Sequence, residues 1–406
     1  EALSCPKRLL VGPWSHMSTA TSLPGPHIDL VPELIRWFGR WLRDEPTGID
    51  EEPPVVVFAR RSTRPAPNLA EMRGEWRAEA TWPPARLRES ILRPHGKGTD
   101  EIAVRGGVGR TAWISCAGKL PWGQPGDQRL DDALSLTYDW EPLDAELDVM
   151  GHPRLALTVT SPIPIVYLSA KLCDVFADGT SALVTRGILN LAHRNGHDAP
   201  SPLEPGVPTA IEIELEATSW VFEPGHRVRL SLAGADWPNT WPPPAGGTLR
   251  VERETVELHL PVLDGPSDLP APVLPPSTGK DAHAASDADG GDAPVIWRFE
   301  DDIMARVTRA VTGYGSSYGS EFGSRIDERY EGTVAVSKDD PGAAWARGEA
   351  VYRIAWPDST VRTEARLDMR SDADAYHVVV EVLAEEIGGP VRHERRYERT
   401  IPRQLQ

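Results

Sequence analysis

The stretch KRLLVGPWSHM, residues 7–17, ends an apolar run on a histidine, His16. The carboxyl end of a buried strand is where α/β enzymes place catalytic and binding groups. An imidazole has an ordinary pKa of about 6.5, which suits a general base that takes a proton from a hydroxyl nucleophile. A lone histidine in such a loop is also commonly a hydrogen-bonded structural residue. His16 is therefore a candidate general base that the surrounding elements must position.

Two elements flank this candidate base. Residues 8–14, RLLVGPW, are typical of a short parallel strand covered on both faces, and residues 29–44, DLVPELIRWFGRWLRD, carry apolar side chains at helical spacing. Asp29 can cap this helix, and Pro32 suits its first turn. One parallel strand and one helix cannot cover each other's apolar faces. Residues 1–52 are therefore predicted to be the terminal piece of a larger α/β domain.

The rest of the chain is predicted to be mainly β. Residues 211–216 and 227–232 alternate apolar with charged or polar side chains, as half-buried antiparallel strands do. Many such runs across residues 53–263, with almost no helical pattern, predict a jelly-roll sandwich of the galactose-binding-like kind. Residues 264–294, rich in Pro, Ala, Asp and Gly, are expected to be a disordered linker, and residues 295–406 an appended antiparallel β domain.

Composition narrows the classes of partner. The formal net charge of −17, with scattered basic residues, disfavours nucleic acid, and no run approaches the roughly 18 apolar residues of a membrane span. Cys5, Cys116 and Cys173 lie far apart and form neither a disulfide framework nor a zinc motif. The first residues show no signal-peptide core. These features predict a cytoplasmic protein without a metal or other cofactor.

Five motifs carry a resemblance to a known family. They are, in order, LLVGPWSHM, RWFGRWLRDEPTGIDEEPPVVVF, EWRAEATWP, AKLCDVFADGTSALVTRGILN and EATSWVFEPGHRVRLSLAGADWP. From residue 7 to about residue 260 the chain resembles the carboxyl-terminal portion of the cocaine esterase and X-Pro dipeptidyl-peptidase hydrolases, the CocE/NonD group. The resemblance implies an α/β-hydrolase domain, of which residues 1–52 are the terminal piece, joined to a jelly roll. It implies a Ser, His, Asp triad that acts on acyl esters or on peptide bonds after a penultimate proline. It also implies that His16 holds the position of the triad base.

The remaining triad members are not found before His16. In α/β-hydrolases the order along the chain is Ser, then Asp, then His. The fifteen residues before His16 hold neither an Asp nor a G-x-S-x-G motif. We therefore expect the chain alone to be inactive, and to act on a small acyl ester or peptide only when an α/β-hydrolase portion completes it. The alternatives are a non-catalytic module that binds carbohydrate or a protein, and one subunit of a split hydrolase with a separate upstream chain; a homo-oligomer is also possible.

Other candidate residues carry weaker signals. Gly315–Gly319 matches G-x-S-x-G, with Ser317 as its serine, but its flanks lack the apolar strand and helix of a nucleophile elbow, which favours a turn between antiparallel strands. His193 and His197 have the spacing of a helical metal pair, but Asn195 and Gly196 between them favour a surface turn.

Three residues are candidates for substrate contact. Trp220 and Trp237 could line a cleft between the jelly roll and the hydrolase domain, or pack in the core. Before AKL, where the family often has an Asp-Phe pair, this chain has Tyr167 and Leu168. The resemblance therefore implies an acyl pocket that differs from that of the better-known esterases, with Leu168 as a candidate pocket residue.

Overall fold

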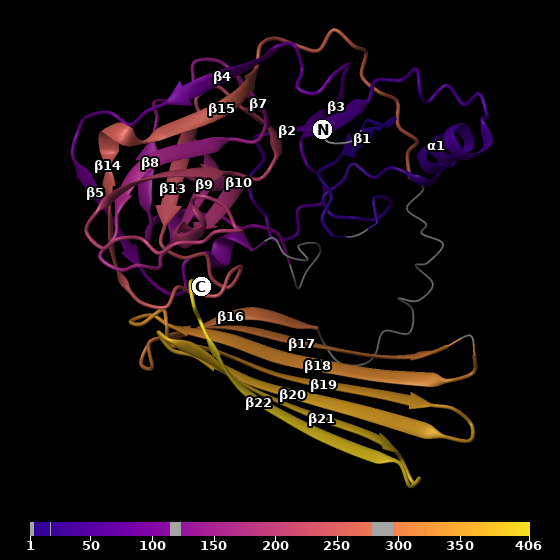
Figure 1. Cartoon of the computed structure of the whole chain (residues 1–406). Coiled ribbons are helices and arrows are strands. Elements are labelled where there is room, and N and C mark those ends of the chain that lie inside the picture. The colour runs from indigo at the N-terminus through magenta and orange to yellow at the C-terminus, as the bar shows by residue number, and fades with distance from the viewer. Residues whose placement is uncertain (1–3, 17, 114–122, 278–294, 321) are drawn as a thin grey trace.

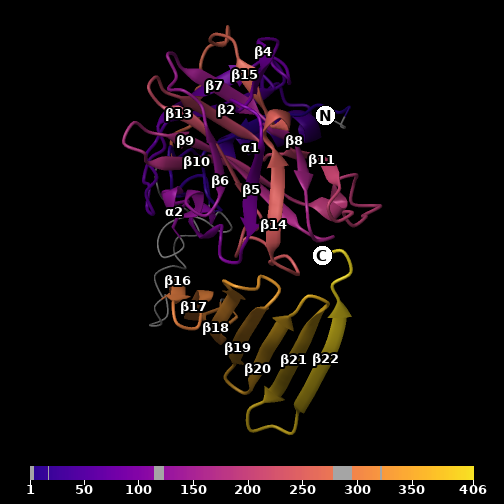
Figure 2. The ribbon, with the colours of Figure 1, turned by 90° about the vertical axis from the view of Figure 1, so that its left-hand side faces the viewer.

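The structure is a computed structural model, and it describes residues 4–16, 18–113, 123–277, 295–320 and 322–406. It is mainly β, as the sequence predicts. A two-sheet sandwich carries the N-terminal piece at one side and a separate seven-stranded sheet below it (Figures 1 and 2). Within the described ranges, no helix has both the length and the apolar character needed to cross a membrane.

The N-terminal piece has the strand and helix that the sequence predicts. Strand β1 (Leu9–Val11) is followed by helix α1 (Val31–Arg43) and then by β2 (Val55–Arg61), which pairs with β1 in parallel. The backbone N–H of Val31 donates to Oδ1 of Asp29 at 3.0 Å, so Asp29 satisfies one amide of the first helical turn. Because β2 also pairs with a strand of the sandwich, the N-terminal piece and the sandwich share one sheet.

The larger sheet of the sandwich has the order β1-β2-β12-β7-β15-β8-β14-β5, with β3 beside β2, β4 beside β15 and β11 beside β8. Its other strands are β3 (Gly74–Glu79), β4 (Leu87–Leu92), β5 (Thr99–Val104), β7 (Leu147–Gly151), β8 (Arg154–Thr160), β11 (Pro208–Glu214), β12 (Thr218–Phe222), β14 (Gly247–Glu252) and β15 (Glu257–Leu263). The predicted alternation in β11 is confirmed, because Ile211 and Ile213 are buried while Glu212 and Glu214 are exposed.

The smaller sheet has the order β10-β9-β13-β6. These strands are β6 (Leu136–Asp139), β9 (Tyr167–Val175), β10 (Ser181–Asn190) and β13 (Arg227–Ala233), and a short helix, α2 (Arg129–Asp132), precedes β6. Single 3₁₀ turns lie at Arg110–Ala112, Leu191–His193 and Arg253–Thr255. Alternate side chains of the two sheets, such as Leu155, Leu172 and Leu230, form one apolar core.

Beyond the sandwich, the chain forms an antiparallel meander in which each strand pairs with the next. Its strands are β16 (Ile296–Asp302), β17 (Val307–Gly319), β18 (Arg325–Ser337), β19 (Ala344–Ala355), β20 (Thr360–Ser371), β21 (Ala375–Glu386) and β22 (Arg392–Pro402). This sheet is the appended β domain that the sequence predicts. Most of the predicted linker, residues 278–294, lies outside the described residues.

The expected turn at Gly315–Gly319 is wrong. These residues are the end of β17, and Ser317 pairs with Asp327 of β18 in an unbroken ladder. The hydroxyl of Ser317 donates to Oδ1 of Asp327 and accepts from Nη2 of Arg325 at 2.6 Å. A serine in the regular part of an antiparallel strand has none of the strained strand-to-helix geometry of a nucleophile elbow.

The two histidines at helical spacing lie in a turn, as the sequence favours. His193 ends a single 3₁₀ turn, and its Nδ1 lies 3.1 Å from Nδ1 of His197. In the described part of the chain, no group of three or more His, Cys, Asp or Glu side chains could hold a metal ion.

Candidate functional site

The loop that follows β1 presents His16 to solvent. The indole N–H of Trp14 donates to the carbonyl of Pro26 at 2.8 Å, and the backbone N–H of Ser15 donates to Oγ of Ser22 at 3.0 Å. These bonds hold the residues before His16. The imidazole itself is exposed, and it makes no hydrogen bond or ion pair with any described residue. The loop is therefore fixed up to Ser15, while the His16 ring is available to a group outside this chain.

Two grooves adjoin the His16 loop and share Trp14 and Arg60. The larger, of about 390 Å³, lies between β1 and the sandwich, with Leu9, Trp82 and His152 among its walls. The smaller, of about 250 Å³, is lined on the other side of Trp14 by Ser15, Pro24, Leu69, Trp220 and others. Their walls are mainly apolar, and Arg60 is the cation common to both. Such surroundings suit an apolar group that carries one negatively charged or strongly polar atom.

Arg60 is held by neutral acceptors. Its guanidinium donates to Oγ1 of Thr218 at 2.6 Å, to the carbonyl of Val184 at 3.1 Å and to the carbonyl of Ser219 at 3.2 Å. It forms no ion pair with any carboxylate among the described residues. Burial lowers the pKa of Arg60 from 12.5 to about 10, so the group stays charged at neutral pH. The grooves thus have a positively charged side wall that a carboxylate or an oxyanion can approach.

A serine, an aspartate and a histidine meet inside the sandwich, but they do not form a catalytic triad. The hydroxyl of Ser62 donates to Oδ2 of Asp174, and Nδ1 of His226 lies 2.8 Å from Oδ1 of the same carboxylate. The indole N–H of Trp220 also donates to Oδ2 of Asp174, at 3.0 Å. In a triad the histidine must stand between serine and aspartate to take the hydroxyl proton. Here the aspartate stands in the middle, so the arrangement ties four strands and loops together.

Asp174 is buried, and this burial raises the pKa of its carboxyl group, against the opposing effect of its hydrogen bonds from Ser62, His226 and Trp220. Sequence reasoning missed this network, because its members are far apart along the chain. The one local signal is an acidic residue within the otherwise apolar run AKLCDVF, where every side chain of β9 is buried.

A second buried polar group lies under α2. Nζ of Lys171 is 3.3 Å from Oδ2 of Asp131, and both side chains are almost fully buried. The same Oδ2 accepts from the hydroxyl of Thr111 at 2.6 Å. Burial opposes ionisation of Asp131, but Lys171 and the hydrogen bonds outweigh it, and the pKa of Asp131 is lowered. This pair stabilises the fold and lines neither of the two grooves.

The structure separates the three residues expected at a substrate cleft. Trp220 is only 2% exposed, yet it lines the smaller groove beside Trp14. Trp237 lies between the sandwich and the seven-stranded sheet, 6.1 Å from the ring of Phe299. Leu168 is fully buried in the sandwich core. Of the three, the structure brings only Trp220 to the grooves beside the His16 loop, and substrate contact by these residues stays a prediction.

Helix α1 turns its polar side to its own chain. Glu33 pairs with Arg8 at 2.9 Å and with Arg36 at 3.1 Å, and Arg40 pairs with Asp50 at 2.8 Å. The apolar stripe of the helix faces solvent. The exposed fractions of its side chains are Val31 58%, Leu34 44%, Ile35 59%, Phe38 52%, Trp41 38% and Leu42 76%. Water-soluble helices normally bury this stripe, so the helix lacks the body that its sequence pattern requires.

Strand β1 also has an open side. In the described part of the chain it pairs with β2 alone, and Leu9 and Val11 are 46% and 43% exposed. Parallel strands are found almost only in sheets with both neighbours and both faces covered. The free edge of β1, the stripe of α1 and the His16 ring thus all lack a partner among the described residues.

Comparison with known proteins identifies the sandwich. Residues 47–272 match the family model of the X-Pro dipeptidyl-peptidase C-terminal non-catalytic domain. A solved structure of an aminopeptidase from a marine sediment archaeon, Thaumarchaeota archaeon, superimposes with a TM-score of 0.51 at 18% sequence identity, and the match covers 64% of this chain and 50% of that chain. At this identity the superposition supports the fold alone.

Several curated proteins are also similar to this chain in sequence. A putative serine esterase of Mycobacterium tuberculosis is 32% identical over 264 residues, which cover 56% of this chain and 40% of that protein. The cocaine esterase of Rhodococcus is 28% identical over 272 residues, covering 57% and 44% of the two chains. A putative Xaa-Pro dipeptidyl-peptidase of Streptomyces avermitilis is 23% identical over 309 residues, covering 62% and 42%. The chain thus matches less than half of the length of these relatives.

Proposed function

Because this chain belongs to the family of X-Pro dipeptidyl-peptidase C-terminal non-catalytic domains, we propose that it is the carboxyl-terminal portion of a serine hydrolase. The proposed hydrolase cleaves acyl esters or X-Pro-type peptide bonds, and an α/β-hydrolase core supplies its serine and aspartate. The observation that carries the proposal is α1, the helix that follows the exposed His16 loop, which directs its polar side to its own chain and its apolar stripe outward. A helix in this state fits a chain that covers one flank of a further sheet.

In the proposed reaction His16 is the general base. A serine hydroxyl of the core attacks the acyl carbonyl while the imidazole takes its proton, and an aspartate of the core fixes the imidazole tautomer. The proton then passes from His16 to the leaving group. The ring is exposed in the first part of the loop after β1, next to the bonded residues Trp14 and Ser15, and this position leaves room for both partners.

The grooves beside Trp14 give the proposed substrate a place. Their apolar walls suit an acyl chain or the side chain of a peptide, and Arg60 adds one positive charge. Among the described residues no serine hydroxyl is hydrogen-bonded to His16, so the polypeptide should not turn over an ester by itself.

Labelling with a fluorophosphonate tests the proposal, because this reagent modifies activated serines. We expect no adduct on the purified chain alone, and a stoichiometric adduct on the core serine when the chain is produced together with the proposed α/β-hydrolase core. His16→Ala should abolish that adduct and the esterase activity. His95→Ala, at an exposed histidine in the loop after β4, is the matched control and should change neither. An adduct on the chain alone, or activity that survives His16→Ala, would sink the proposal.

A further inference from the structure

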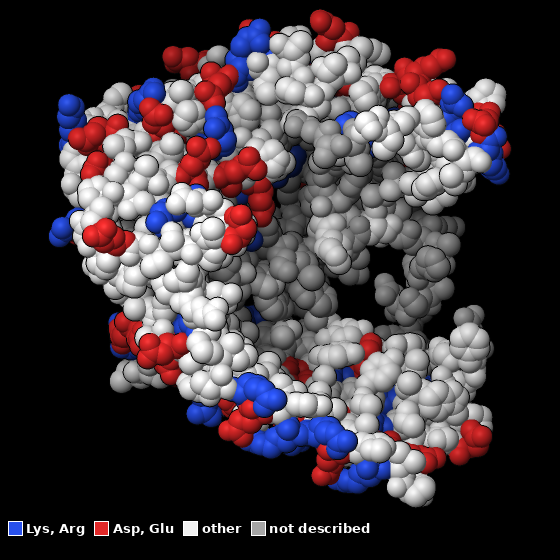
Figure 3. Space-filling model, viewed as in Figure 1, with Lys and Arg blue, Asp and Glu red and all other residues white. Residues whose placement is uncertain are grey.

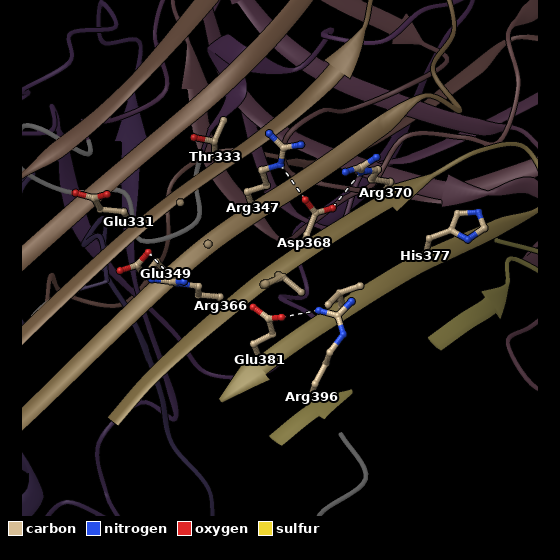
Figure 4. A pocket seen from close by; sticks show the side chains of 14 residues that line it. Glu331, Thr333, Arg347, Glu349, Arg366, Asp368, Arg370, His377, Glu381 and Arg396 are labelled. Atoms are coloured by element: carbon tan, nitrogen blue, oxygen red, sulfur yellow. Dashed lines mark hydrogen bonds and ion pairs between the residues drawn. The ribbon is translucent and has the colours of Figure 1, made fainter. Parts of the chain in front are cut away.

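The seven-stranded sheet has two chemically different faces. Since side chains of a strand alternate between faces, the unbroken registers of β17 to β22 assign each residue to a side. Figure 4 shows the charged face, where Arg347 pairs with Asp368 at 3.0 Å and Arg396 with Glu381 at 2.5 Å. The opposite side, called the apolar face below, carries mainly aromatic and aliphatic residues, which include Tyr314, Tyr330, Tyr352, Ile354, Val380 and Val382.

The sandwich covers one end of the apolar face. Trp237 and the partly buried Trp241 pack there with Ala310, Val336 and Ala344. The indole N–H of Trp241 donates to Oγ of Ser371 at 3.1 Å, and its ring contacts Tyr376 edge-on at 6.1 Å. This end of the face therefore serves as an interface between two parts of the chain.

The other end of the apolar face has no cover among the described residues. Tyr314 and Tyr330 are 37% and 40% exposed, and their rings stack at 6.1 Å. About six residues of each strand from β17 to β21 lie beyond the sandwich, which corresponds to roughly 20 Å by 20 Å, or about 400 Å². An exposed apolar patch of several hundred Å² commonly marks an interaction site.

By the strand registers, two carboxylates of the described chain lie on this part of the face, Glu386 at the last position of β21 and Glu328 on the inner strand β18. Glu328 accepts from the hydroxyl of Ser316 at 2.8 Å and from that of Tyr330 at 3.1 Å, and the hydroxyl of Tyr314 lies 3.5 Å away. No cation of the described chain pairs with it. Its tyrosine neighbours hold the carboxylate in place without neutralising it, so the face is complementary to an apolar surface that presents one Lys or Arg.

The uncovered region faces the same side as the unpartnered helix. In Figures 1 and 2, α1 lies above the seven-stranded sheet in both views. Figure 3 shows the molecule hollowed between the N-terminal piece and that sheet, with charged side chains gathered along the lower edge of the molecule, away from the hollow. Helix α1 and the apolar face therefore lie on the same side of the seven-stranded sheet.

We propose that the apolar face binds the same α/β-hydrolase core that completes the His16 site. This inference rests on the proposed function. One body in the hollow covers the edge of β1, the stripe of α1 and the uncovered part of the sheet. A second copy of the chain, packed on the sheet alone, would cover only about 400 Å² per partner, whereas stable interfaces bury about 800 Å² per partner. In this arrangement the core lies between the N-terminal piece and the seven-stranded sheet, and the sheet holds the core against the sandwich.

Two neighbouring valines give a matched test. Val380 lies on the apolar face and Val379 on the charged face of the same strand, β21, and both are half-buried. Binding is measured between this chain and the proposed α/β-hydrolase core, produced as a separate polypeptide. We expect Val380→Lys to weaken binding at least tenfold and Val379→Lys to change it less than twofold, with equal melting temperatures of the two variants.

The charge of Glu328 gives a second, milder test. Glu328→Gln should weaken binding about tenfold and reduce its salt dependence, because the amide keeps the hydroxyl contacts but loses the charge. Glu331→Gln, on the charged face of the same strand, is the control. These variants leave the His16 loop untouched.

The outcomes separate this inference from the proposed function. If Phe38→Lys on α1 abolishes binding while Val380→Lys and Glu328→Gln do not, the core binds without the sheet and only the docking face is refuted. If the wild-type chain binds no core at all, both proposals fall. If sedimentation shows a dimer of the chain alone that Val380→Lys dissociates, the occupant is a second copy and the docking face is refuted in this form.

Discussion

The guanidinium of Arg60 lies over the indole ring of Trp220, 5.1 Å from its centroid, at the wall of the groove beside the His16 loop. An arginine in this position contributes both a cation–π contact and three hydrogen bonds to the groups behind it. The cation that faces the grooves is therefore fixed by the fold before any ligand binds.

Replacing Arg60 should cost stability as well as charge. Arg60→Met keeps much of the side-chain volume but leaves the acceptors of Thr218, Val184 and Ser219 without their donor, which should lower the free energy of unfolding by about 2 kcal/mol. The next residue, Arg61, makes a surface ion pair with Glu146, and Arg61→Met should cost less than about 1 kcal/mol. Urea titration measures the free energy of unfolding of the two variants. Equal decreases in this free energy would show that the buried acceptors find other hydrogen-bond donors.

The buried pair of Lys171 and Asp131 makes a prediction about acid. The pKa of Asp131 is lower in the folded chain than in the unfolded chain, so its contribution to stability is complete above the ordinary value of 3.8. That contribution should fall as the pH drops below 3.8 towards the lowered pKa of the folded state. Asp131→Asn should remove this part of the acid dependence.

Asp131→Asn should also destabilise the chain at neutral pH by about 3 kcal/mol, because Lys171 then remains buried without a counter-charge. Asp127→Asn, whose partner Arg129 is well exposed, is the comparison. Unfolding followed by circular dichroism between pH 3 and pH 8 measures both effects. A parallel pH profile for the wild type and Asp131→Asn would contradict the assignment.

Ser317 gives a prediction of no effect on chemistry. It lies in β17 between Asp327 and Arg325, on the charged face of the sheet. Ser317→Ala should leave fluorophosphonate labelling of the chain with its core unchanged and should alter the free energy of unfolding by less than about 1 kcal/mol. Loss of labelling in this variant would mean that the serine is reactive despite its place in a regular strand.

Local patterns predicted the elements near the His16 loop. The apolar spacing from Val31 to Leu42 predicted α1, and the alternation around Ile211 predicted β11, because side-chain period follows directly from helix and strand geometry. The same helical spacing indicated that the helix needs a sheet to cover. These features depend on neighbours in sequence, so one chain suffices to find them.

Contacts between residues far apart in the chain could not be predicted from the sequence. Gly315 to Gly319 has the composition of a turn, yet pairing with β18 holds it extended, since strand formation depends on cross-strand neighbours more than on local preference. Ser62, Asp174 and His226 meet only because three separate segments of the sandwich converge. The uncovered part of the apolar face likewise could not be predicted from the sequence, because its position depends on which end of the sheet the sandwich covers.

The exposed stripe of α1 makes the last prediction, for the chain without its core. Phe38 is 52% exposed at the middle of the stripe, and its neighbours Leu34 and Leu42 are also exposed. The isolated chain should bind a hydrophobic dye and should associate increasingly with concentration. Phe38→Ser should lower dye binding and association without lowering the melting temperature, because the ring makes few contacts in the isolated chain.

Arg43→Ser, at the end of the same helix, is the control for Phe38→Ser and should leave dye binding unchanged. Addition of the core should suppress dye binding by the wild-type chain, since the core would cover the stripe. A wild-type chain that is monomeric at high concentration and binds no dye would mean that α1 is already covered in solution. The apolar stripe of α1 would then require no further sheet to cover it, and the main reason to expect a core beside His16 would be removed.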